Sequence, residues 1–190
     1  RGLGDVYKRQ HLRSDKFKTA CISLSLLSQL RRESASMNAL IPYVLRRGTT
    51  RYGDMESLSR RMDELYGTAI EPVVRRIGEI QCIGFYGSFP EDEYLPGGEK
   101  LLHSAVELMG EMLLSPNTRG GLLQQSYVDS EREKLLERIR SRINDKRSYS
   151  LSRCIEEMCC YEDFAVSRLG SESEAEGINL SLIHISEPTR

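Results

Sequence analysis

Alternating apolar and polar positions predict strands in two parts of the chain. Between Phe17 and Leu26 the even-numbered residues are mostly apolar and the odd-numbered ones mostly polar, which predicts a strand buried on one face. The runs Thr68–Arg75 and Glu79–Ser88 have strand-like composition and are separated by a short segment that contains Gly78. We therefore expect them to pair as an antiparallel hairpin.

Apolar residues at helical spacing predict helices in most of the remaining chain. The clearest helix covers 55–66, because Asp54 is a good N-cap and Gly67 stands where a left-handed C-terminal residue is expected. A second helical pattern contains Pro42, so that helix is kinked there or begins late. The pattern that contains Pro42 covers Ser34–Arg47. The remaining helical patterns cover Glu99–Leu114, Val128–Ile143 and Ser148–Cys160.

The order of these elements indicates the fold class. A strand, helices, a hairpin and further helices predict an α+β domain, with helices packed on a mainly antiparallel sheet. The Val128–Ile143 helix is highly charged and has a narrow inner stripe that includes Leu135 and Ile143. The acidic segment Glu172–Glu176 is expected to be exposed.

Composition and charge narrow the function classes. The chain has 190 residues with 27 basic and 28 acidic side chains, so its net charge gives no electrostatic case for nucleic-acid binding. Its apolar runs are too short for a membrane span, and no secretory signal is visible. The five cysteines are an odd number without a C-x-x-C spacing, which favours a reducing cytoplasm.

The two ends of the chain differ from the rest. Residues 1–10 (RGLGDVYKRQ) and 181–190 (SLIHISEPTR) resemble translated sequencing adapters, so we exclude both from the fold. Residues 11–180 then form one domain, which we interpret as truncated. A truncated domain should expose apolar surface that the missing parts would cover.

Several sequence strings resemble the N-terminal domain of insulinase/pitrilysin-like peptidases. The strings RMDELYG (Arg61–Gly67) and NDKRSY (Asn144–Tyr149) are similar to a non-catalytic bacterial branch, the elongation factor P 5-aminopentanol modification-associated proteins. The resemblance covers about Lys16 to Leu180. It implies an α+β layered domain, usually one of two similar domains in a complete polypeptide.

The resemblance also implies where a zinc site would lie. Active members use an inverted H-x-x-E-H motif on the first long helix, just before a Gly-Thr pair. Here that stretch is Asn38–Leu45 (NALIPYVL), before Gly48-Thr49, and no acidic residue occurs between Glu33 and Asp54. Side chains of this kind cannot hold zinc or activate water. We therefore predict no catalytic residues, no metal ligands and no cofactor.

A more distant glutamate completes the zinc shell in active members. The corresponding helix here offers Glu131, Glu133 and Glu137. Without histidine partners, we interpret these residues as an exposed face with i,i+3 pairs such as Glu131 with Lys134 and Glu137 with Arg140.

Other residues whose side chains could take part in catalysis or ligand binding have simpler, structural interpretations. The cluster Cys154, Cys159 and Cys160 is expected to be core packing rather than a metal or redox site. His103 is expected at the edge of a buried helical face, as a hydrogen-bonded structural residue. The Gly97-Gly98 and Gly120-Gly121 pairs lack the residues of a phosphate-binding loop and are interpreted as loops.

Arginine pairs recur along the chain and raise the question of a basic groove. Acidic residues are interleaved with them, so a solvated face or a partner interface is the favoured interpretation. The pairs are Arg31-Arg32, Arg46-Arg47, Arg60-Arg61 and Arg75-Arg76.

Three functional hypotheses follow. The first is a cytoplasmic, non-catalytic insulinase-family domain that acts as a partner or assembly subunit of a related insulinase-like subunit, as a hetero- or homodimer. A protein or peptide substrate fits this hypothesis, and the resemblance links it to elongation factor P modification. The second is a zinc metalloendopeptidase whose catalytic site lies outside this segment. The third is a binding module for RNA or a translation factor, which the charge balance disfavours.

Overall fold

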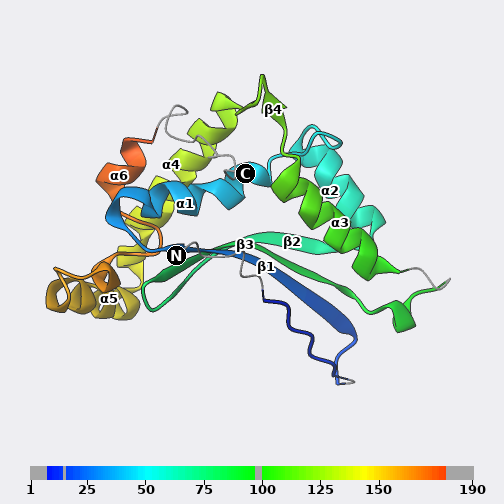
Figure 1. Cartoon of the computed structure of the whole chain (residues 1–190), viewed down its shortest axis with the longest axis horizontal. Coiled ribbons are helices and arrows are strands. Elements are labelled where there is room, and N and C mark those ends of the chain that lie inside the picture. The colour runs from blue at the N-terminus through cyan, green and yellow to red at the C-terminus, as the bar shows by residue number, and fades with distance from the viewer. Residues whose placement is uncertain (1–7, 15, 97–99, 179–190) are drawn as a thin grey trace, which may run out of the picture.

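A three-stranded antiparallel sheet forms one layer of the domain (Figure 1). The computed structural model describes residues 8–14, 16–96 and 100–178. Strand β3 (Ile80–Pro90) lies in the middle, between β1 (Thr19–Gln29) and β2 (Ala69–Ile77). Both pairings are antiparallel, so the predicted strand and the predicted hairpin are confirmed.

The larger helices cover one face of this sheet (Figure 1). Helices α1, α2, α3 and α4 lie on that side, whereas α5 lies at the periphery of the domain. This arrangement confirms the α+β class. The helices are α1 (Arg32–Leu45), α2 (Met55–Glu64), α3 (Leu101–Leu114), α4 (Gln125–Ser141), α5 (Lys146–Met158) and α6 (Glu172–Glu176). Shorter elements are the 3₁₀ turns η1 (Asp92–Tyr94), η2 (Arg142–Asn144) and η3 (Asp163–Ala165), and the small hairpin of β4 (Thr118–Arg119) and β5 (Leu122–Leu123).

Helix α1 continues through its proline. It begins at Arg32, so the alternative of a late start is wrong. Pro42 lacks an N–H and leaves the carbonyl of Asn38 without its helical donor. The helix nevertheless runs on to Leu45, and at its C-terminal end the Arg46 N–H donates to the Pro42 carbonyl at 3.2 Å.

Helix α2 begins at the cap that its sequence predicts. Asp54 accepts a hydrogen bond from the Ser57 backbone N–H at 2.7 Å, and Ser57 Oγ accepts one from the Asp54 N–H at 3.3 Å, which makes a capping box. Hydrogen bonds from the Ser57 backbone N–H and side chain lower the pKa of the Asp54 carboxyl group below its ordinary value. Gly67 is left-handed as predicted, with φ 71°, but the helix already ends at Glu64 and Tyr66 is left-handed as well, with φ 56°.

The hydrophobic core lies between the sheet and helices α1 to α4. Some predicted inner positions are wrong, because Leu102 and Val106 of α3 and Ile143 beyond α4 are more than two-fifths exposed. Other residues of the same helices already fill the space between the helices and the sheet. Fully buried large side chains include Phe85, Leu30, Leu40, Leu58, Ile70, Met109, Met112 and Leu135.

The last helices depart furthest from the predicted packing. Helix α5 contains no buried residue, so its predicted inner stripe is not part of the core. Helix α6 buries Ala175 against the domain while the acidic residues Glu172 and Glu176 remain exposed, as expected. Residues 1–7, residues 181–190 and the Gly97-Gly98 pair lie outside the described residues.

Candidate functional site between α1 and α4

The segment Asn38–Leu45, where the resemblance predicts the position of a zinc motif, faces α4 with an aromatic ring. The guanidinium of Arg138 lies 3.9 Å from the centroid of the Tyr43 ring, a cation–π contact. Arg138 Nη1 is buried, and it has no hydrogen-bond partner among the described residues. The ring is therefore the main compensation for this part of the Arg138 charge.

A buried ion pair lies beside this contact. Arg47, two residues beyond α1, donates from Nε to Glu131 Oε1 at 2.8 Å and from Nη2 to Ser130 Oγ at 2.6 Å. The Glu131 side chain is only 6% exposed, and Lys134 also donates to it at 2.8 Å. The Arg47 guanidinium lies 5.8 Å from the Tyr127 ring centroid. This network joins the end of α1 to the middle of α4.

These residues do not fit a zinc ion. A catalytic zinc site needs three neutral imidazole or anionic donors arranged around an open position. Here α1 presents Tyr43 with Arg138 stacked on it, and the buried carboxylate at this contact, Glu131, is already neutralised by Arg47 and Lys134. Two guanidinium groups at this contact would repel a divalent cation. Within the described ranges, no cluster of three His, Cys, Asp or Glu side chains could hold a metal.

The Glu131 side chain corrects one prediction and confirms part of it. Its i,i+3 pair with Lys134 is present, but Glu131 is buried rather than on an exposed face. Arg140 pairs with Glu172 at 2.6 Å and with Glu176 at 3.3 Å, so it ties α4 to α6 instead of pairing with Glu137. Glu133 and Glu137 are exposed, as expected.

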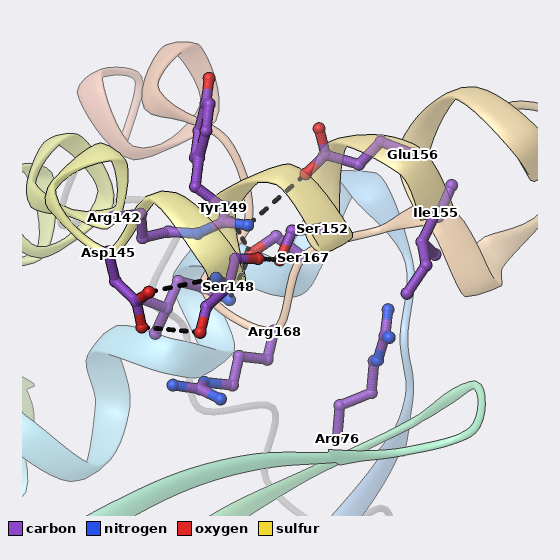
Figure 2. A pocket seen from close by; sticks show the side chains of 12 residues that line it. Arg76, Arg142, Asp145, Ser148, Tyr149, Ser152, Ile155, Glu156, Ser167 and Arg168 are labelled. Atoms are coloured by element: carbon purple, nitrogen blue, oxygen red, sulfur yellow. Dashed lines mark hydrogen bonds and ion pairs between the residues drawn. The ribbon is translucent and has the colours of Figure 1, made fainter.

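A cavity of about 540 Å³ lies between the end of β2, η2, α5 and the segment after η3 (Figure 2). Arg76 donates from Nη1 to the carbonyls of Phe164 at 2.7 Å and Val166 at 3.2 Å. Arg142 donates to Ser167 Oγ at 3.2 Å and lies 3.6 Å from Glu156. Most of these polar groups are therefore occupied in holding the 163–167 segment in place.

The N-terminus of α5 closes one side of this cavity (Figure 2). Asp145 accepts hydrogen bonds from the Ser148 N–H at 3.1 Å and from Ser148 Oγ at 2.6 Å. These bonds lower the pKa of Asp145. The helix end is thus capped by the chain's own carboxylate, which already takes the place of an external anion.

The cysteine and histidine predictions need correction. Cys154 and Cys160 are exposed and Cys159 is half-buried, so the cluster is not core packing. The reason is that α5 has no layer above it. His103 is exposed on α3 rather than at the edge of its buried face. Gly120 and Gly121, with φ 65° and 81°, form the turn between β4 and β5, which confirms the loop interpretation.

The arginine pairs do not converge on one groove. Arg46 donates to the Ile70 carbonyl and pairs with Glu71 at 2.8 Å, which fastens α1 to β2. Arg60 and Arg61 pair within α2 with Glu56 and Glu64, each at 3.1 Å. Arg32 donates to the Cys160 carbonyl at 3.0 Å. Most of these arginines therefore stabilise contacts within or between neighbouring elements of this domain.

The sequence did not reveal the two contacts that define the α1–α4 site. Arg47 and Glu131 are 84 residues apart, and no local pattern links them. The same holds for Tyr43 and Arg138. The one available signal was the presence of a charged residue, Glu131, on the same helical stripe as the buried Val128 and Leu135.

Comparisons with known proteins relate this fold to metallopeptidase-like proteins. No protein-family model matches the chain. The chain is 31% identical over 173 residues to the Bacillus subtilis protein named "Probable inactive metalloprotease YmfF", covering 91% of this chain and 41% of the relative. The chain is thus similar to a metallopeptidase-like protein whose name describes it as inactive, and it spans well under half of that relative's length.

Solved structures show the same fold. A conserved protein from Enterococcus faecalis V583 superposes with a TM-score of 0.79 at 21% identity, over 88% of this chain and 40% of that one. A protease from Helicobacter pylori superposes with a TM-score of 0.59 at 12% identity, over 87% and 37% of the two chains. No described helix has the length and hydropathy needed to cross a bilayer.

Proposed function

We propose that this chain is a non-catalytic insulinase-family domain that acts as a partner or assembly subunit of a related insulinase-like protein. The observation that carries the proposal is the α1–α4 contact. The stretch that would supply metal ligands instead packs Tyr43 under Arg138, and the nearby Glu131 is neutralised by Arg47. The similarity to a relative described as an inactive metalloprotease supports the same conclusion.

A metal and co-purification assay tests this proposal. The intact protein is purified alone and together with a related subunit that carries H-x-x-E-H, and zinc content and peptide hydrolysis are measured. We expect less than stoichiometric zinc in this protein alone, and a stable complex with the related subunit. Stoichiometric zinc with chelator-sensitive hydrolysis by this protein alone would show that it is a peptidase with its site elsewhere.

A matched variant separates catalysis from assembly. Replacing the motif glutamate of the related subunit by glutamine should abolish hydrolysis and leave the complex intact. If the two proteins do not co-elute in either form, the partner role is wrong even though the absence of zinc stands. A protein or peptide substrate should be hydrolysed only when the zinc-bearing subunit is present.

The resemblance adds a proposed process and compartment. We propose a role in elongation factor P modification in the cytoplasm, where five free cysteines are compatible with a reducing environment. Mass spectrometry of elongation factor P from a deletion strain tests the first part. An unchanged 5-aminopentanol modification would contradict it, and recovery of the protein in a membrane or extracellular fraction would contradict the second.

A further inference from the structure

Helix α5 carries a line of exposed apolar side chains. Leu151 is 63% exposed, Met158 is 77% exposed and Tyr161, just beyond the helix, is fully exposed. Cys154 is also exposed and lies between them. The spacings of three and four residues place these side chains on one stripe, as in the a and d positions of a coiled-coil seam.

The stripe points away from the domain. The other side of α5, which includes Tyr149, Ile155 and Glu156, lines the cavity described above (Figure 2). Helix α5 itself lies at the edge of the molecule, away from α2 and α3 (Figure 1). The stripe is therefore accessible along its whole length to an approaching helix.

The charges at the two ends of the stripe have opposite signs. Lys146 and Arg147 outnumber the capping carboxylate of Asp145 at the start of α5, and Glu162 follows its C-terminus. Arg153 is paired within the helix with Glu156 at 2.7 Å and Glu157 at 2.6 Å. By contrast, no ion pair joins Lys146, Arg147 or Glu162 to another side chain in the part of the chain that the structure describes.

We propose that α5 is a self-association surface, on which α5 of a second copy of this chain packs in the antiparallel direction. Antiparallel packing brings Lys146 and Arg147 of one copy near Glu162 of the other at both ends of the contact, whereas parallel packing would place like charges together. A twofold axis through the middle of the stripe places opposite charges together at both ends of the contact.

The expected dimer is weak. One helix per copy makes a contact at the low end of interface sizes, below about 1,200 Å² in total. Contacts of this size are typical of weak, transient complexes, so we expect a dissociation constant on the order of 10 μM. This inference deepens the proposed function, because it names a surface through which an assembly subunit could pair with a second copy of itself. It rests on the proposed function only for that biological role.

Sedimentation equilibrium of the chain tests the surface. We expect a monomer–dimer equilibrium that Leu151→Glu with Met158→Glu weakens by at least about tenfold, because two charges enter an apolar seam. Leu114→Glu is the matched control, since Leu114 is 80% exposed at the end of α3 and should leave the equilibrium unchanged. Circular dichroism verifies that each variant is folded.

Charge exchange tests the direction of packing. Lys146→Glu with Arg147→Glu should weaken the dimer, and adding Glu162→Lys should restore it, because all the end contacts are then reversed together. A monomer at about 100 μM, roughly tenfold above the expected dissociation constant, would overturn the proposal, and so would a dimer indifferent to the α5 variants. Such a result leaves the zinc and related-subunit assays untouched, so the two proposals fail separately.

Thiol labelling of Cys154 in the intact protein distinguishes a second copy of the chain from another occupant of the stripe. We expect Cys154 to be labelled in dilute solution and protected at high concentration, as read by peptide mass spectrometry. Protection at every concentration would show that a segment of the same molecule covers α5, and would overturn self-association.

Discussion

The buried ion pair between Arg47 and Glu131 gives the sharpest stability prediction. Replacing Glu131 by Gln removes the negative charge but keeps the shape of the side chain. The Arg47 side chain, only 19% exposed, would then have no anionic partner. Breaking a buried pair from one side is costly because the remaining charge stays desolvated.

The magnitude follows from what remains around Arg47. Loss of one partner from a fully buried pair costs about 3–5 kcal/mol. Arg47 retains its bond to Ser130 at 2.6 Å and some contact with solvent, so we place Glu131→Gln lower. We expect a loss of about 2–3 kcal/mol, which is a large part of the ~5–15 kcal/mol typical of a domain.

Urea unfolding followed by circular dichroism measures this loss. Glu137→Gln is the matched control, because Glu137 is exposed on the same helix and its replacement should change the free energy of unfolding by less than about 0.5 kcal/mol. The double variant Arg47→Met with Glu131→Leu should recover most of the loss. If Glu131→Gln behaves like Glu137→Gln, the pair is not buried as described and the reasoning is refuted.

Three further predictions concern the fold, each read from the urea midpoint. Phe85→Ala removes a fully buried ring and should cost about 3–5 kcal/mol; a loss below about 1 kcal/mol would contradict its central position. Gly110→Ala, where an added methyl meets no atom within 4 Å, should stabilise α3 by about 0.5–1 kcal/mol, and a loss would reveal an unseen clash. Asp54→Ala should lower stability at about pH 6. Because the pKa of Asp54 is lowered in the folded state, its charge contributes fully to the free energy of unfolding above about pH 4, and this contribution is lost as the pH falls through the lowered value. A difference from wild type that stays constant over this pH range would contradict the charged cap.

Local patterns predicted the elements that depend on local physics. The alternation in Phe17–Leu26 predicted β1, and the short segment around Gly78 predicted the pairing of β2 with β3. Asp54 and Gly67 marked the start of α2 and the left-handed turn after its end, because both act through backbone groups within a few residues. These signals need no knowledge of the rest of the chain.

The sequence could not show which amphipathic faces are covered. The stripes of α3 and α5 look alike in sequence, yet Met112 is fully buried and Met158 is 77% exposed. Periodicity tells which side of a helix is apolar, and only the tertiary arrangement tells whether a layer lies against it. The burial of Glu131 has the same origin, because its partner Arg47 comes from a distant segment.

The side chain of Gln81 shows how closely α1 is positioned. It is fully buried on β3, accepts a hydrogen bond from Asn38 Nδ2 at 3.1 Å, and donates to the carbonyls of Ala35 at 2.9 Å and Arg168 at 2.8 Å. Apolar contacts tolerate small sliding of one layer over another, but a buried amide bonded on both its oxygen and its nitrogen does not. Helix α1 therefore keeps a fixed position over the sheet, although its residues from Asn38 to Leu45 include no histidine, cysteine or carboxylate of the kind that holds zinc. In this domain the buried Gln81 side chain on β3 fixes where the helix lies, whichever side chains the helix presents there.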